Sequence, residues 1–367
     1  MDAFISAQGN WENGFSPPPK GNGLNGHVNS LIIYQGKLVA GGAFTKAGSI
    51  SCRYIASFDG GKWSRLGKGL PCATSCLQVW NNQIVACCLD GRLVDKRGKL
   101  EADNTAYVTI YRERSWKEVA KTNGGCLRSM QVFQDKLFLG GDELALSSET
   151  DASSSLWCWD GIDRLEPVDK LTGRIERISI WQEQLVVIGN FKLPGQDEFT
   201  AVALWDGADW QQLPWPHGSI PSAVTTHQDS LVVAGPSAVS HSLGSGLIPI
   251  IAMWDGYNWK EIPFPLDTKS TYNPTIEVIL SDRDNLILGG DIFLDEPTEV
   301  GSICQWNGEG WESYQNGLHT DWSAPCWVAD ILSTEEGFYA GGNFDFSSEG
   351  DRSQASSNIA FWKADLE

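Results

Sequence analysis

Positive charge and long apolar runs are both scarce in this sequence. Its 367 residues carry 27 lysines and arginines against 46 aspartates and glutamates, which gives a formal net charge of −19. Proteins bind phosphate backbones with clustered lysines and arginines, so this balance argues against a nucleic-acid partner and favours a neutral or cationic one. No apolar run reaches the roughly 20 residues of a membrane-spanning helix, and residues 247–254 form one of the longest. We therefore expect neither a nucleic-acid nor a membrane partner.

The chain also lacks the marks of secretion. Its N-terminus has neither the charged start nor the apolar core of a signal peptide. The nine cysteines are an odd number, and no Asn-X-Ser/Thr acceptor with a permitted middle residue occurs. Both features are typical of a reducing, intracellular setting. We predict a cytoplasmic protein, globular by its 41% apolar and 20% charged residues.

Motifs of known chemistry are missing as well. The sequence contains no Gly-X-Ser-X-Gly elbow, no phosphate-binding loop and no dinucleotide fingerprint. Its cysteines offer no strong zinc pattern. We therefore predict no cofactor, with one calcium motif considered below.

What the sequence has in excess is tryptophan, with 17 residues. An aromatic residue followed by Asp-Gly or Asn-Gly recurs along the chain, and in most copies a tryptophan follows five positions after that aromatic. The phrases begin at Phe58, Trp159, Trp205, Trp254 and Trp306, with Tyr111 as a degenerate copy, and the second tryptophans are Trp63, Trp116, Trp210, Trp259 and Trp311. A tryptophan between adjacent sheets buries a large apolar area. We expect the repeated tryptophans to pack sheets together.

Pairs of small residues mark the same repeat. The second members are Gly42, Cys88, Gly141, Gly189, Gly235, Gly290 and Gly342, spaced 46, 53, 48, 46, 55 and 52 positions apart. A period of about 50 residues with four short strands per unit is typical of a β-propeller. We predict an all-β, seven-bladed β-propeller with four antiparallel strands per blade, forming one domain over residues 1–367. The last copy lacks its second tryptophan and Trp11 supplies it, so the N-terminal strand would complete the C-terminal blade and close the ring.

Spacing inside the units separates fixed turns from variable connections. The apolar anchor of each first strand precedes the second small residue by 11 positions in every copy, whereas connections after the second strand and between units vary in length. In a propeller, such variable connections share one face, and function usually lies on loops of this kind. Three consecutive connections are long, and they run from Trp259 to Ile279, from Trp311 to Ile331 and from Trp11 to Leu31. We call them the enlarged sector and expect a site there.

Two short motifs carry a family resemblance. Gly-Gly-X-Phe occurs at residues 41–44 and 341–344 ahead of an aromatic residue, and Gly-Leu-Asn-Gly occupies residues 23–26. In these motifs the chain resembles kelch and galactose-oxidase-type propellers, most closely fungal cortical polarity markers and uncharacterised bacterial propeller repeats. The resemblance implies the fold over essentially the whole chain, but propellers include scaffolds, binders and enzymes alike. The copper-ligand pattern of galactose oxidase does not map onto this sequence.

Candidate ligand-binding residues stand outside the repeat, on the variable connections. They are Trp215, Trp322, Trp327, His27 and Asp321. A loop tryptophan there either packs beneath its loop or stacks on a sugar, ring or alkyl ligand. Histidine is a common metal ligand and acid–base group, although no His-X-X-His spacing occurs.

Candidate catalytic residues are polar side chains near the start of the first strands and in the enlarged sector. They are Glu277 or Asp330 as general base, Arg128 or Arg177 as anion clamp, and Tyr272 or His319 as proton donor. First strands line the channel of a propeller, so these groups would lie near its mouth. The alternative is that the two arginines and Glu176 only neutralise one another.

One loop resembles the first half of a calcium-binding loop. Asp345, Glu349 and Asp351 stand at alternating positions with Ser347, and Gly350 takes the sixth place. The twelfth place holds Ser356 instead of an acidic residue. Calcium binding and a solvated acidic loop both stay open.

Three functions are compatible with these patterns. The first is recognition of a small molecule or protein partner on the loop-rich face over the channel. The alternative is an enzyme of small-molecule metabolism, such as a lyase, cyclase or bond-forming catalyst, with an acid–base site at the channel mouth. The third is an interaction scaffold without a small-molecule site. Whether the protein is an enzyme is left open by the sequence.

Overall fold

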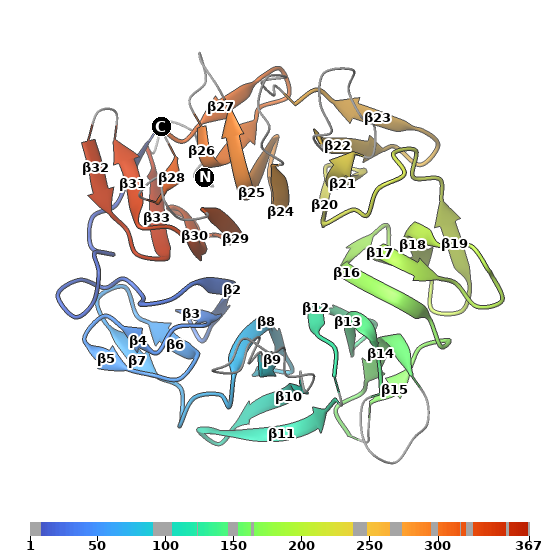
Figure 1. Ribbon diagram of the computed structural model, residues 1–367, viewed down its shortest axis with the longest axis horizontal. Coiled ribbons are helices and arrows are strands. Elements are labelled where there is room, and N and C mark those ends of the chain that lie inside the picture. The colour runs from blue at the N-terminus through green and yellow to red at the C-terminus, as the bar shows by residue number, and fades with distance from the viewer. Residues whose placement is uncertain are drawn as a thin grey trace, which may run out of the picture. The chain divides into compact units, whose positions relative to one another are not determined.

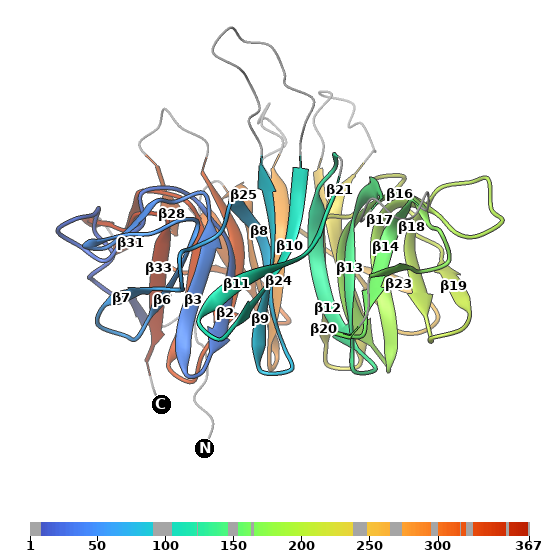
Figure 2. The ribbon, with the colours of Figure 1, turned by 90° about the horizontal axis from the view of Figure 1, so that it is seen from below.

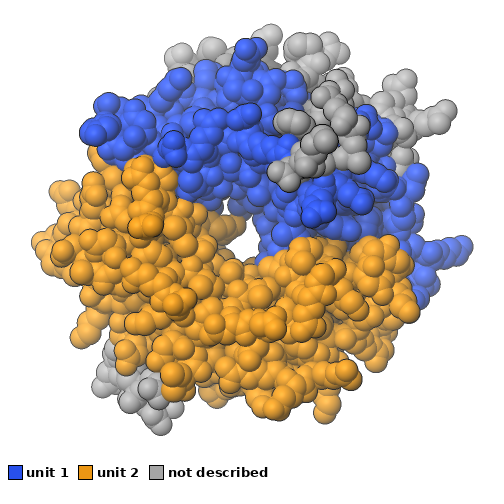
Figure 3. Space-filling model, turned by 180° about the vertical axis from the view of Figure 1, so that it is seen from behind, with its two compact units in different colours: residues 1–31, 46–49, 215–367 blue, residues 32–45, 50–214 orange. Residues whose placement is uncertain are grey.

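Every regular element that the structure describes is a β-strand. This computed structural model describes residues 9–90, 105–122, 124–145, 153–162, 165–237, 248–264, 274–294, 300–315, 317–320, 326–349 and 352–365. None of the described segments forms a helix with the length and apolarity to cross a membrane. The chain divides into unit 1, residues 1–31, 46–49 and 215–367, and unit 2, residues 32–45 and 50–214 (Figure 3). That residues 1–367 form one domain stays a prediction.

Unit 2 consists of antiparallel sheets whose strands follow chain order (Figure 1). Its strands are β2 (Val28–Tyr34, which begins in unit 1), β3 (Lys37–Gly42), β5 (Ile50–Ser51), β6 (Ile55–Phe58), β7 (Trp63–Arg65), β8 (Ala73–Trp80), β9 (Gln83–Asp90), β10 (Thr105–Arg112), β11 (Ser115–Lys121), β12 (Leu127–Phe133), β13 (Lys136–Leu144), β14 (Ser154–Trp159), β15 (Glu166–Pro167), β16 (Thr172–Trp181), β17 (Gln184–Lys192), β18 (Thr200–Trp205) and β19 (Trp210–Leu213). Two four-stranded sheets have the orders β2-β3-β6-β7 and β8-β9-β10-β11. The run β12-β13-β14-β15 joins β16-β17-β18-β19 through a single residue pair, Asp142 with Arg174. The β8–β9 and β12–β13 turns lie at the same edge of their sheets (Figure 2).

Unit 1 repeats the four-stranded pattern. Its strands are β1 (Gly9–Trp11), β4 (Lys46–Ala47), β20 (Ala223–His227), β21 (Ser230–Ser237), β22 (Ile248–Trp254), β23 (Trp259–Ile262), β24 (Thr275–Asp282), β25 (Asn285–Leu294), β26 (Val300–Trp306), β27 (Trp311–Ser313), β28 (Leu318–His319), β29 (Trp327–Ser333), β30 (Gly337–Asn343), β31 (Phe346–Glu349), β32 (Arg352–Ala355) and β33 (Ile359–Ala364). The sheets have the orders β20-β21-β22-β23, β24-β25-β26-β27 and β1-β33-β30-β29, beside the small sheet β28-β31-β32. In the third sheet Trp11 of β1 lies opposite Trp362 of β33. The N-terminal strand therefore pairs with the last strand of the chain.

The repeated aromatic phrase is the turn between the third and fourth strands of a sheet. Asp255 illustrates it, because its Oδ1 accepts hydrogen bonds of 2.8 Å from the backbone N–H groups of Tyr257 and Asn258. The flanking tryptophans, Trp254 and Trp259, face each other across the two strands with ring centroids 5.3 Å apart. A side-chain oxygen at this position fixes the turn, which explains why Asn307 can replace aspartate in another copy.

The small-residue pairs have two separate packing roles. A Cβ on Gly140, the first member of its pair, would lie 2.7 Å from Ile175 Cγ2 on the next four-stranded run. A Cβ on Gly141, the second member, would collide with the carbonyl oxygen of Cys126, the residue directly before the adjacent strand β12. The first position therefore sets how closely neighbouring sheets pack, and the second sets how closely two strands approach.

The Gly-Gly-X-Phe motif fixes the connection that follows the second strand. The Gly42 N–H donates to the Tyr54 carbonyl at 3.0 Å, and the Tyr54 N–H donates to the Phe44 carbonyl at 3.0 Å. Tyr54 is held at a φ of 65°, a left-handed conformation that is uncommon for residues other than glycine. Asn358 takes the equivalent place after the second copy of the motif, with a φ of 63°. The motif therefore anchors the loop that contains Arg53.

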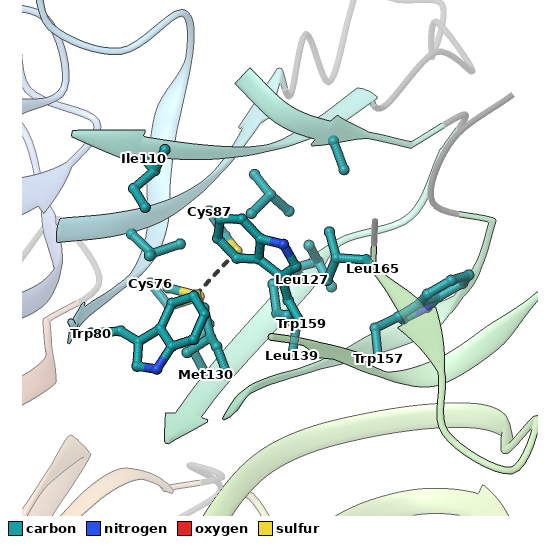
Figure 4. Close-up of a cluster of buried hydrophobic side chains, with 14 of the residues drawn as sticks. Cys76, Trp80, Cys87, Ile110, Leu127, Met130, Leu139, Trp157, Trp159 and Leu165 are labelled. Atoms are coloured by element: carbon teal, nitrogen blue, oxygen red, sulfur yellow. Dashed lines mark hydrogen bonds between the residues drawn. The ribbon is translucent and has the colours of Figure 1, made fainter. Parts of the chain in front are cut away.

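Buried aromatic and sulfur side chains fill the space between sheets in unit 2. One cluster contains Trp80, Trp159, Cys87 and Met130, and Trp80 and Trp159 lie 5.1 Å apart (Figure 4). The Cys87 thiol lies 3.6 Å from the Met130 sulfur. These contacts confirm that the tryptophans of this cluster pack sheets, and they explain why a cysteine can replace glycine as the small residue.

Candidate functional site

A β-bulge recurs near the start of the first strand of a sheet. The pairing register shifts by one residue at Ser75, Arg128, Glu176, Glu277 and Ala329. Each of these residues stands two positions before the apolar anchor of its strand. Because a bulge residue is unpaired, its side chain can be re-aimed away from the regular sheet direction. Two of the predicted catalytic residues, Arg128 and Glu277, therefore occupy special backbone positions.

Asp330, a predicted general base, is engaged by backbone groups. Its carboxylate accepts a hydrogen bond of 2.6 Å from the Leu31 N–H and one of 2.9 Å from the Ile331 N–H. Ser129 makes an equivalent contact in unit 2, where its hydroxyl accepts from the Ile178 N–H at 3.0 Å. Both residues directly precede their anchors and connect one first strand to the next. This contact gives Asp330 a bracing role, and its role as a base stays a prediction.

The predicted arginine clamps lie in a charged cluster of unit 2. Arg128 pairs with Asp142 at 3.2 Å and with Glu176 at 3.8 Å, and Arg174 forms a further ion pair with Glu176. Arg177 donates to the Glu176 carbonyl oxygen at 3.0 Å. The Asp142 and Glu176 carboxylates both pair with arginine, and the role of Arg128 and Arg177 as anion clamps stays a prediction.

Two predicted ligand-binding residues meet in unit 1. The imidazole of His27 and the indole of Trp327 lie with ring centroids 5.9 Å apart and planes tilted by 53°. His319 forms β28 with Leu318 and lies opposite Phe346 of β31. Burial lowers the pKa of His27 and that of His319 below the ordinary value of 6.5. Burial therefore disfavours the protonated form of both imidazoles.

Trp215 packs against its neighbours. Its ring lies edge-on to His217 at 4.7 Å and to Trp259 at 5.1 Å. This geometry agrees with the packing alternative for this loop tryptophan.

Of the remaining predicted site residues, the structure describes Asp345 and Glu349. Tyr272, Asp321, Trp322 and Asp351 lie outside the described residues. The main chain of Asp345 donates to the His319 carbonyl at 2.9 Å. In the backbone register of the β31–β32 hairpin, Glu349 lies opposite Arg352. Within the described ranges, no three acidic, histidine or cysteine side chains gather in a way that could hold a metal ion. Calcium binding stays a prediction.

Asp291 is a perturbed carboxylate that the sequence reasoning missed. It follows Gly289 and Gly290 on β25 and lies opposite Thr275 of β24. Burial raises the pKa of Asp291 to about 6. Asp142 follows a glycine pair in the same way but is ion-paired with Arg128. The sequence signal that could have identified Asp291 is an acidic residue directly after a pair of small residues, here Gly289 and Gly290.

We expect Asp291→Asn to stabilise the protein at about pH 8 and to have almost no effect at about pH 4. The raised pKa means that the folded state binds a proton more tightly than the unfolded state, so stability falls as pH rises from about 4 to about 6. Because Asp291 is only half-buried, solvent screening limits the gain to about 1 kcal/mol. Urea unfolding of the native protein and the variant at both pH values measures this gain in stability. An equal effect at both pH values would contradict a raised pKa of Asp291.

A pocket of about 400 Å³ lies in unit 2 between two variable connections. It is lined by residues 51–53, Ile55 and residues 65–69, and we call it the β5–β7 pocket. One wall comes from the connection after the second strand, and the other from the segment that leads from β7 to β8. Both are connections of the kind predicted to carry function, although this pocket does not belong to the enlarged sector.

The walls of the β5–β7 pocket are tied by backbone contacts. Arg65 donates from Nε to the Ser51 carbonyl at 2.6 Å, and the Leu70 N–H donates to the Arg53 carbonyl at 3.0 Å. Gly69 has a φ of 76°, and a Cβ there would lie 2.6 Å from both Cβ and the carbonyl oxygen of Arg53. Only glycine lets the two walls approach this closely.

Comparison with known proteins supports the fold and leaves the chemistry open. No protein-family model and no curated protein sequence matches the chain. The β-propeller domain of the Trilobed protease from Pyrococcus furiosus is 10% identical, with 93% of this chain and 97% of that chain covered and a TM-score of 0.50. A computationally designed protein, Ika8, is 12% identical over 96% of this chain and 100% of that chain, with a TM-score of 0.48. The GH93 α-L-arabinofuranosidase of Fusarium graminearum is 11% identical over 80% and 93%, with a TM-score of 0.39. The similarity to the Pyrococcus domain supports a β-propeller fold for this chain.

Proposed function

We propose that the chain is a seven-bladed β-propeller of the kelch-like kind, closed by β1, that recognises a small molecule in the β5–β7 pocket. Seven runs of four antiparallel strands support the blade number: β2-β3-β6-β7, β8 to β11, β12 to β15, β16 to β19, β20 to β23, β24 to β27 and β29-β30-β33-β1. The pairing of β1 with β33 supports closure, because it satisfies the edge of the last sheet.

The pocket itself is the observation that carries recognition. Its volume of about 400 Å³ falls in the range of ligand sites, which is about 300–1,000 Å³. Buried apolar residues, Cys52, Ile55 and Leu66, contribute to its lining, and polar groups stand at its walls. An apolar floor with a few polar groups is the usual composition of such sites.

We expect Ser51→Trp to abolish small-molecule binding without unfolding the protein. Ser51 is exposed and lines the pocket, so an indole there fills the cavity and leaves the core unchanged. The probes are 4-phenylbutyrate, 4-phenylbutan-1-ol and 4-phenylbutylamine, which share an apolar group and differ in charge. At least one of them should bind the native protein in a calorimetric titration.

Ser115→Trp is the matched control, since Ser115 is exposed at the β10–β11 turn. It should leave binding unchanged. Failure of all three probes to bind, or equal binding by Ser51→Trp, would overturn recognition at this pocket.

An enzyme of small-molecule metabolism is the second candidate, and one observation favours it. A carboxylate with a pKa of about 6, such as Asp291, is suited to a general base near neutral pH. Glu277 lies on the adjacent strand β24. Turnover in a metabolite mixture, followed by NMR, should then disappear in Asp291→Asn, and persistence of the turnover would exclude this role.

A further inference from the structure

The β5–β7 pocket is surrounded by positive charge in a protein that is strongly negative overall. Three cationic residues, Arg53, Arg65 and Lys68, belong to its lining, and no aspartate or glutamate does. The whole chain carries 27 basic residues against 46 acidic ones. Since the field inside a cleft depends on the charges that line it, the ligand preference here should be opposite to the one expected from the net charge.

We infer that the pocket binds an amphiphilic anion, a carboxylate or phosphate headgroup attached to an apolar body. This inference rests on the proposed function, because it names the ligand class of the same site. The cations supply the headgroup contacts, and the partly accessible apolar lining at Cys52 and Leu66 supplies the surface for the apolar body.

Arg65 is positioned for a headgroup by its own backbone contact. Its Nε donates to the Ser51 carbonyl at 2.6 Å, which restricts the guanidinium plane. The terminal nitrogens of a guanidinium remain donors in a fixed fork, and this fork matches the two oxygens of a carboxylate. Among the described residues, no ion pair joins Arg53, Arg65 or Lys68 to a carboxylate.

Arg53 lies on the opposite wall, where the backbone fixes its position. Its carbonyl accepts from the Leu70 N–H, and Gly69 approaches its Cα and Cβ closely. The preceding residue, Cys52, is buried. Burial raises the pKa of the Cys52 thiol to about 11, so this thiol stays neutral and adds no negative charge to the pocket.

The floor favours an apolar body over a bare anion. Ile55 is fully buried and Leu66 nearly so, and both belong to a core cluster that includes Leu70. Each methylene group removed from water contributes about 0.8 kcal/mol. A headgroup without an apolar body would make the contacts to the cations but would lack this apolar contribution.

Comparison of the three phenylbutyl probes tests the ligand class separately from the site. We expect 4-phenylbutyrate to bind at least about fivefold more tightly than the alcohol, because charge-assisted hydrogen bonds to the headgroup are lost in the alcohol. The amine should bind more weakly still. Sodium acetate, which has the headgroup without the apolar body, should bind at least about tenfold more weakly than 4-phenylbutyrate.

A double variant assigns the preference to the cations. Arg53→Gln with Lys68→Gln should weaken 4-phenylbutyrate binding at least about tenfold and leave the alcohol unchanged. Lys37→Gln with Lys62→Gln removes the same charge from two turns of the same sheet and should have no effect beyond about twofold. If the alcohol or amine binds as tightly as the carboxylate, or if both double variants behave alike, the anionic ligand class is wrong while the site stands. If no probe binds, both the ligand class and the site are overturned.

Discussion

Trp11→Ala is expected to lower the free energy of unfolding by about 3–5 kcal/mol, the loss typical of a buried tryptophan. The side chain is 2% exposed and packs edge-on against Trp362 at 5.2 Å and Phe338 at 5.9 Å. Its indole N–H donates to the Tyr314 carbonyl at 3.1 Å. The substitution therefore leaves a cavity and a buried carbonyl without its donor.

Guanidinium unfolding of the native protein and the variant measures this loss. Asn10→Ala is the matched control on the same strand, and removal of this exposed side chain should cost no more than about 0.5 kcal/mol. A loss below about 1 kcal/mol for Trp11→Ala would mean that β1 does not complete the sheet with β33, and closure of the proposed ring would be contradicted.

Gly141→Ala is the second substitution with a large expected effect, a loss of at least about 2 kcal/mol. The added methyl group would collide with the Cys126 carbonyl oxygen and would lie 2.9 Å from the Cα of Leu127. Since both obstacles belong to the backbone, β12 and β13 must separate to accept it. Separation would also disturb the hydrogen bond from the Asp142 N–H to the Cys126 carbonyl.

Gly310→Ala provides the comparison for that experiment. A Cβ at Gly310 meets nothing within 4 Å, and its φ is outside the left-handed region. It should change stability by no more than about 0.5 kcal/mol. Equal effects of the two substitutions, measured by thermal unfolding, would show that the second small residue is not a packing requirement.

The sheets could be predicted from the sequence because hairpin geometry fixes residue spacing. Strand side chains alternate between faces, so each anchor, small pair and aromatic phrase must recur at constant separations. The β-bulges could not be predicted from the sequence, again because the spacing between the repeated residues is constant. Each copy that has one inserts its extra residue before the anchor, as at Arg128 and Glu277, and a constant spacing therefore does not reveal it.

The candidate site was harder to predict because it depends on connections without a repeat. The pocket combines a loop anchored by Tyr54 with the segment that contains Gly69, and neither their approach nor the enclosed volume follows from strand spacing. Burial of Asp291 likewise depends on neighbours that are distant in sequence. The sequence identifies Asp330 as a polar residue on a first strand. Its contact with Leu31, which lies 299 residues away in the sequence, could not be foreseen.

The net charge of the chain and the lining of the proposed pocket predict opposite ligand charges. The value of −19 describes the whole surface, whereas a ligand in the pocket faces Arg53, Arg65 and Lys68. Salt screens the interaction between exposed charges beyond about 8–10 Å. We therefore expect the lining residues to decide the ligand preference.

A crystal structure of the protein with 4-phenylbutyrate tests recognition at the β5–β7 pocket most directly. We expect the phenyl group to contact Cys52 and Leu66, with the carboxylate within hydrogen-bond distance of Arg65 or Arg53. An empty pocket at a ligand concentration well above the calorimetric dissociation constant, or a ligand bound elsewhere, would contradict the proposed function.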